Sequence, residues 1–137
     1  MRNTKIKNKK MNPETYALKT QVVNLIREAK RGGARLPWIR VIIGDQTSNH
    51  KDVLGCAVIK GDKMWITEEA INLGTDTLRN IVFHEIVHAV TGFGHDDRCP
   101  LMKPTLDGYL LNKTECMKYL KGYIKHGATM LTMAVAS

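Results

Sequence analysis

The chain has 137 residues, of which 43% are hydrophobic and 25% are charged. This length suits one compact domain, and the composition excludes a disordered chain or a coiled coil. No apolar run approaches the roughly 20 residues that a membrane-spanning helix needs, so an integral membrane protein is not expected. The three cysteines, Cys56, Cys99 and Cys116, are too few for a disulfide scaffold and are typical of a reducing compartment.

Positive charge is concentrated at the N-terminus. Lysine and arginine number 21 against 13 acidic residues, a net charge of +8, and five of the basic residues lie within the first ten positions. We expect residues 1–11 to form a disordered basic tail, which either touches nucleic acid or another polyanion weakly or is only a solvated leader. The apolar segment of a secretory signal does not follow this tail, so a cytoplasmic location is expected.

The first half of the chain predicts one helix and a small sheet. An Asn-Pro pair is typical of a helix start, apolar residues recur at helical spacing and a Gly-Gly pair ends the pattern, which predicts a helix over residues 13–30. Residues 36–43 are apolar on both faces towards their end, which predicts a strand covered on both sides, with Trp38 in the core. Residues 54–60 and 64–67 flank a Gly-Asp pair and predict a hairpin.

The last predicted element is a helix that follows a proline-bearing loop. Asn112 can cap this helix, with Glu115 three residues on, and Gly127 is expected to stop it. The chain then forms a single domain over residues 12–127. Residues 128–137 are expected to be a C-terminal tail, to which we assign no role.

Between the predicted sheet and the proline-bearing loop, the sequence predicts a helix that begins at Thr75 or Asp76. This helix contains the sequence HEIVH. Four residues along an α-helix turn the side chain by about 400°, so His84 and His88 project from the same face one turn apart. Two imidazoles placed in this way can bind one Zn²⁺. Glu85 lies beside them without being a ligand, as a general base needs to.

Structural zinc sites close with four protein ligands whereas catalytic sites leave one position open, so a third ligand is expected just after this helix. There, Gly92 and Gly94 can end the helix and permit a reversal, and His95, Met102 and Pro104 follow. In this segment the chain resembles the metzincin zinc peptidases, whose pattern is H-E-x-x-H-x-x-G-x-x-H followed by a methionine turn.

The resemblance implies a zinc endopeptidase with one catalytic Zn²⁺. Three histidines would then hold the metal: His84, His88 and His95. Glu85 would be the base that activates the metal's water, and Met102 would be the turn methionine. The spacing departs from the family, because the glycine and the third histidine each come one residue later. The extra residue either lengthens the helix or widens the turn, and Asp96 is the substitute third ligand.

The resemblance also implies a substrate-binding strand. In metzincins an edge strand above the cleft pairs with an extended substrate, and the matching segment here is 54–59, with Gly55, Cys56 and Ala57 at its centre. An interior strand with both edges paired is the alternative. Tyr109, after the methionine turn, is either an oxyanion partner or an ordinary packed or exposed tyrosine.

We therefore predict a small α+β domain of the zincin type, in which an N-terminal helix and a short mixed sheet pack on the HEIVH helix. The methionine turn and a C-terminal helix close it. The predicted function is that of a monomeric zinc metalloendopeptidase acting on extended protein or peptide substrates, with no membrane partner. Two alternatives stay open: a zinc protease similar to the DNA-associated SprT and WLM kinds, favoured by the basic tail, and a non-catalytic zinc-binding or nucleic-acid-binding module.

Overall fold

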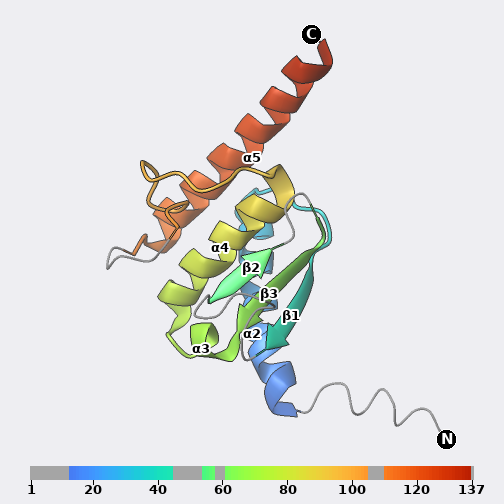
Figure 1. Ribbon diagram of the computed structural model, residues 1–137. Helices are drawn as coiled ribbons and strands as arrows, with labels where there is room; N and C mark the ends of the chain where they lie inside the picture. The colour runs from blue at the N-terminus through green and yellow to red at the C-terminus, as the bar shows by residue number, and fades with distance from the viewer. Residues whose placement is uncertain (1–12, 45–53, 58–60, 105–109, 137) are drawn as a thin grey trace, which may run out of the picture.

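The computed structural model describes residues 13–44, 54–57, 61–104 and 110–136, with side chains described as far as residue 126. Helices and strands both contribute, which confirms the predicted α+β class (Figure 1). In chain order the elements are α2 (Pro13–Arg31), β1 (Arg40–Gly44), β2 (Gly55–Ala57), β3 (Lys63–Thr67), α3 (Glu68–Ile71), α4 (Thr75–Thr91) and α5 (Lys113–Ala136). In the described part of the chain, no helix combines the length and apolar character needed to cross a bilayer.

The sheet is mixed and has three strands in the order β1-β3-β2. Strand β3 pairs in parallel with β1 and antiparallel with β2, so β2 and β3 form the predicted hairpin arrangement. The predicted turn between them falls partly on residues 58–60, outside the described residues. Strand β2 therefore lies at an edge of the sheet, with β3 as its strand partner in the part of the chain that the structure describes.

One face of the sheet supports the helices. Met64 and Ile66 of β3 and Val41 of β1 are buried on this face, where α2 packs on β1 and α4 packs on β2 and β3. On the opposite face of β1, Arg40 is exposed and Ile42 is only half-buried, as is Trp65 beside it on β3, so the expectation of a strand covered on both sides is wrong. Trp38 precedes β1, which starts later than predicted, and is 68% exposed rather than in the core.

The helix starts differ in how they are capped. At α5 the prediction holds, because Glu115 N–H donates to the Asn112 side chain (2.8 Å) and Asn112 N–H donates to the Glu115 carboxylate (3.0 Å). At α4 the cap is Gly74, without a side-chain hydrogen bond, so neither Thr75 nor Asp76 has the predicted capping role. Asp76 instead lies in the first turn, where its charge suits the helix dipole.

The end of α5 was also predicted wrongly. The helix does not stop at Gly127 but continues to Ala136, and its C-terminal part extends away from the rest of the domain (Figure 1). A glycine inside a helix costs only about 1 kcal/mol relative to alanine. The following residues are rich in alanine, methionine and leucine, which favour helix, so one glycine does not end it.

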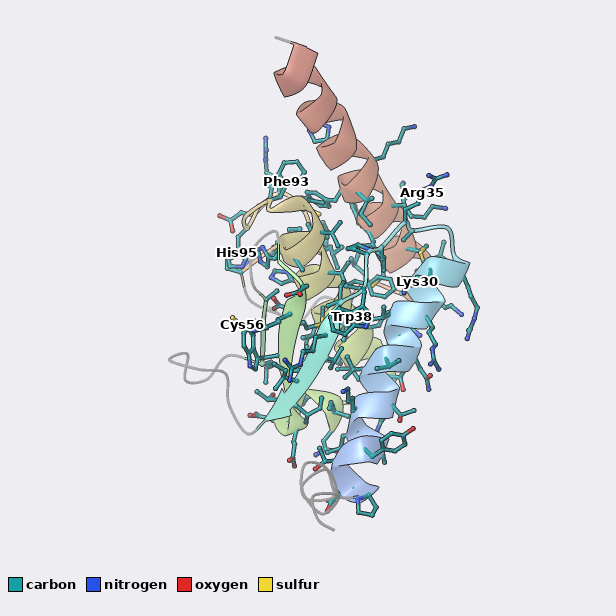
Figure 2. All side chains as sticks on the ribbon, turned by 90° about the vertical axis from the view of Figure 1, so that its right-hand side faces the viewer. Lys30, Arg35, Trp38, Cys56, Phe93 and His95 are labelled. Atoms are coloured by element: carbon teal, nitrogen blue, oxygen red, sulfur yellow. The ribbon has the colours of Figure 1, made fainter. Side chains whose placement is uncertain are left out.

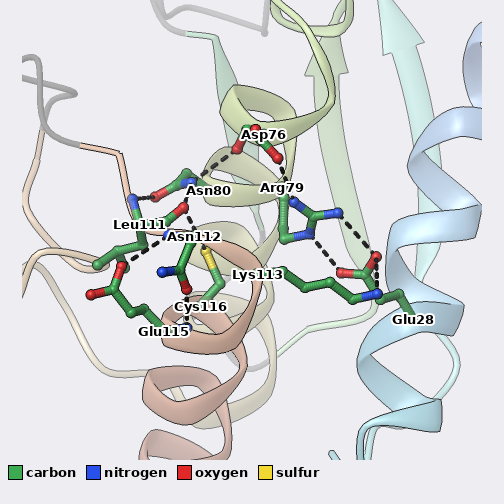
Figure 3. A network of polar contacts seen from close by, with 9 residues as sticks. All are labelled: Glu28, Asp76, Arg79, Asn80, Leu111, Asn112, Lys113, Glu115 and Cys116. Carbon is green, nitrogen blue, oxygen red and sulfur yellow. Dashed lines mark hydrogen bonds and ion pairs between the residues drawn. The ribbon is translucent and has the colours of Figure 1, made fainter.

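A polar network holds the first half of α4 against its neighbours (Figure 3). The buried Arg79 guanidinium donates to Glu28 of α2 (2.6 and 3.1 Å) and to Asp76 (2.9 Å). The Asn80 side chain donates to the Leu111 carbonyl (3.0 Å) and accepts from the Leu111 N–H (3.1 Å). The Arg79–Glu28 pair is largely shielded from water, so removing one partner should destabilise the protein, and these contacts tie α4 to α2 and to the segment before α5.

Candidate metal centre

The second half of α4 presents the two histidines of the HEIVH sequence as predicted. The His84 and His88 rings lie one turn apart with their centroids separated by 4.7 Å. Most of the helix is buried against the sheet, α2 and α5, and Glu85 between the histidines is only 6% exposed. The histidines therefore project from a rigid element rather than from a loop.

The chain reverses immediately after α4 and returns a third histidine. Gly92 adopts a left-handed conformation (φ 80°), and its N–H donates to the His88 carbonyl (3.1 Å), which ends the helix. The extra residue in the spacing therefore lies in α4, which runs to Thr91. His95 follows Gly92 with two residues between them, the same spacing as in the metzincin pattern. One ligand nitrogen from each of His84, His88 and His95 lies within 4.8 Å of the others.

Backbone carbonyls orient both helical histidines. His84 Nδ1 lies 2.7 Å from the Leu101 carbonyl, and His88 Nδ1 lies 2.7 Å from the Phe93 carbonyl. A carbonyl only accepts hydrogen bonds, so each Nδ1 carries the proton and each Nε2 carries a lone pair. The two Nε2 atoms face one another at 3.2 Å.

This arrangement fits a metal ion and suits the metal-free protein poorly. Two nitrogens bound to one tetrahedral Zn²⁺ at 2.0–2.1 Å are about 3.3 Å apart, close to the separation of the two Nε2 atoms. Without a cation or a shared proton, their lone pairs would repel each other. Carbonyl partners on the far nitrogen are also the usual support of metal-binding histidines. The His84–His88 pair therefore fits Zn²⁺, and the His95 ring lies near enough to offer a third ligand.

Burial favours the neutral form of the His84 and His88 imidazoles, which is the form that binds a metal. It lowers the pKa of His84 from 6.5 to about 4, although the hydrogen bond to the Leu101 carbonyl opposes this. Burial also lowers the pKa of His88, against the smaller effect of the Phe93 carbonyl. His95 is exposed, so the group is open on that side.

Glu85 lies in the most strongly perturbed environment of the centre. Burial raises the pKa of its carboxyl from 4.5 to about 8. It also raises the pKa of the nearby Cys56 thiol, with a further contribution from the Glu85 charge. A carboxyl with a pKa near neutrality is suited to accept and return a proton.

Strand β2 approaches the centre closely. A Cβ atom at Gly55 would lie 3.3 Å from Glu85 Cγ and 3.2 Å from both Ile81 Cγ2 and Ile66 Cδ1. Only glycine allows this spacing without movement of a neighbour. Cys56, the next residue, points to the opposite face of the sheet, in register with Trp65.

Replacing Gly55 with alanine is expected to destabilise the protein by about 1–2 kcal/mol, because the methyl group would crowd three buried side chains. Chemical unfolding measures this loss. Gly122, at an exposed position of α5, is the matched control, since a Cβ there meets nothing within 4 Å. Gly122→Ala should be neutral or stabilising, and equal effects of the two substitutions would contradict the close approach of β2 to Glu85.

The other predicted site residues lie apart from the histidine group or outside the described part of the chain. Asp96, the substitute third ligand, accepts hydrogen bonds from the Arg98 backbone and guanidinium instead. Met102 is fully buried, and its carbonyl accepts from Asp96 N–H (2.9 Å), which closes the loop of the predicted methionine turn. Tyr109 lies outside the described residues.

Several groups near the centre were missed at the sequence level. The Leu101 and Phe93 carbonyls carry no side-chain signal, because any residue has a carbonyl. Tyr123 of α5 packs against the hydrophobic core, with its ring 5.8 Å from that of Phe93 in the loop after α4. Only the helical periodicity of α5 could have indicated that Tyr123 faces the domain.

Comparisons with known proteins identify no relative of this chain. No family model, no curated protein and no solved structure matches it. Its function therefore has to be argued from the site itself.

Proposed function

We propose that this protein is a zinc-dependent metalloendopeptidase. The observation that carries the proposal is the pair of Nε2 lone pairs held 3.2 Å apart by two carbonyl hydrogen bonds, with His95 completing the group. A surface histidine pair that is merely solvated needs neither the fixed tautomers nor the third ring. The buried carboxyl of Glu85 beside the pair favours a catalytic centre over a purely structural one.

The residues of this chain would divide the chemistry among them. A bound zinc ion supplies a water molecule of lowered pKa and polarises a carbonyl group. The Glu85 carboxylate accepts a proton at one oxygen and later returns it to the leaving amine. The Leu101 and Phe93 carbonyls keep the His84 and His88 rings in place throughout, since they hold each Nδ1 proton.

The edge strand offers a way to hold an extended substrate. Strand β2 pairs with β3 on one side, and an additional peptide strand on its other side would receive main-chain hydrogen bonds irrespective of sequence. Gly55 brings this strand against Glu85, so a peptide bound along β2 would pass the centre. This supports cleavage of unstructured protein segments rather than of small amides.

The experiment that tests the proposal combines metal analysis with cleavage assays. We expect one zinc per chain, cleavage of an unfolded protein substrate, loss of cleavage with a chelator and recovery with Zn²⁺. His95→Ala should weaken zinc binding strongly, whereas Asp96→Ala, its neighbour in the same loop, should not. Absence of stoichiometric zinc after reconstitution would overturn the proposal, and zinc binding without cleavage of any peptide would favour the non-catalytic module.

A further inference from the structure

A groove of about 580 Å³ adjoins the histidine group on the side away from β2. Its walls come from the loop after α4 and from α5. Its lining residues include Phe93, His95, Asp96, Arg98, Tyr123 and His126. Of these side chains, only His95 belongs to the candidate metal centre described above.

One wall of the groove is aromatic. The centroid of the Phe93 ring lies 5.8 Å from that of Tyr123 and 5.7 Å from that of His126. The planes of the Phe93 and His126 rings are inclined by only 26° to each other. Phe93 and Tyr123 are half-buried, and His126 is exposed. Their contacts with each other leave ring surface facing the groove, and an added planar ring could stack on it.

One ion pair neutralises part of the charge within the groove. Asp96 accepts from the Arg98 backbone N–H (2.9 Å), from Nε (3.2 Å) and from Nη2 (3.4 Å). Asp97 also lines the groove and adds a further carboxylate, so the charge of these acidic and basic side chains is small and slightly negative. The aromatic wall is then the feature that selects what binds.

The groove is continuous with the histidine group. His95 lines both, and its ring centroid lies 5.2 Å from that of His84 and 4.9 Å from that of His88. Figure 2 shows Cys56 of β2, His95 and Phe93 following one another along the same side of the molecule. A peptide that runs along β2 past the histidines therefore reaches the groove with its next residues.

We propose that this groove is a specificity subsite that takes an aromatic side chain of the peptide substrate, next to the bond that is cleaved. The inference rests on the proposed peptidase function. The substrate ring stacks on the wall formed by Phe93, Tyr123 and His126. Specificity for sequence then comes from this subsite, whereas β2 contributes affinity through main-chain hydrogen bonds.

The test measures peptide binding to the zinc-loaded Glu85→Gln variant, so that cleavage does not interfere. Fluorescently labelled peptides differ at one position only, which carries tryptophan, phenylalanine, alanine, lysine or aspartate. We expect the aromatic peptides to bind roughly tenfold more tightly than the alanine peptide. Equal binding of aromatic and alanine peptides, or tighter binding of the lysine or aspartate peptide, would overturn the subsite.

Variants of the wall separate stacking from structural support. Tyr123→Leu and His126→Ala should each reduce the aromatic preference severalfold, whereas Tyr123→Phe keeps the ring and should preserve it. Tyr16→Leu, which removes an exposed tyrosine of α2, is the matched control and should change nothing. An unchanged preference in both Tyr123→Leu and His126→Ala would overturn the assignment.

Failure of the subsite and failure of the proposed function give different results. If the wild-type protein cleaved the peptides at a rate that did not depend on whether the varied position is aromatic, the subsite would be overturned. The proposed peptidase function would remain. If the zinc-loaded variant bound none of the peptides and the wild-type protein cleaved none, both proposals would fall.

Discussion

Replacing Glu85 with glutamine is expected to reduce peptide cleavage by at least about 100-fold while leaving zinc binding stoichiometric. The amide has nearly the shape of the carboxyl, so the contacts of Glu85 with Gly55 are kept. It cannot accept a proton, however, and the step assigned to the carboxylate fails. Cleavage rates at saturating zinc, together with metal analysis of the same sample, measure the two effects separately.

The matched control is Glu69→Gln, which makes the same chemical change at an exposed position of helix α3. Its cleavage rate should equal that of the wild-type protein. Retained cleavage in Glu85→Gln would show that Glu85 is not the general base. Loss of zinc from Glu85→Gln would instead show that the carboxyl helps to hold the metal, contrary to the three-histidine assignment.

The elements with strong local signals were predicted well. The periodicity of α2 and the reciprocal capping of α5 by Asn112 and Glu115 both depend on residues within a few positions of each other. Features that depend on the rest of the fold were predicted less well. The exposure of Trp38 is set by which surfaces other elements cover, and sequence spacing carries no information about this. The length of α5 was missed for a different reason, because the helix-favouring residues after Gly127 outweigh the cost of one glycine.

The same division applies to the candidate site. The placement of His84 and His88 follows from helix geometry alone, so their spacing predicts it. His95 depends on how the chain turns, and the left-handed conformation of Gly92 explains why one extra helical residue still returns it to the group. The two carbonyls that fix the histidine tautomers could not be predicted, because they come from tertiary structure.

The metal-free protein should become less stable relative to Glu85→Gln as the pH rises. Burial raises the pKa of Glu85 from 4.5 to about 8, so between these values the folded chain binds a proton that the unfolded chain has lost. Stability then falls by about 1.4 kcal/mol per pH unit. From about pH 5.5 to about pH 7.5 the wild-type protein should lose roughly 3 kcal/mol relative to the variant.

The variant also isolates Glu85 from the histidines. Because burial lowers the pKa of His84 from 6.5 to about 4, the unfolded chain binds a proton first as the pH falls, and stability is lost in that direction. Wild-type protein and variant share this loss, which cancels in their difference. Chemical unfolding with a chelator present, repeated across the pH range, gives the difference directly.

Zinc should abolish the contribution of Glu85 to this pH dependence as well as stabilise the fold. At a thousand times the dissociation constant, a ligand that binds only the folded state adds about 4 kcal/mol to stability. A divalent cation beside Glu85 favours the ionised carboxylate, so zinc binding at neutral pH should release a proton that the Glu85→Gln variant cannot release. Calorimetry in buffers of different ionisation enthalpy counts that proton. Equal proton release by the two proteins would mean that Glu85 is already ionised in the metal-free fold. Another interaction would then have to offset the cost of burying its charge.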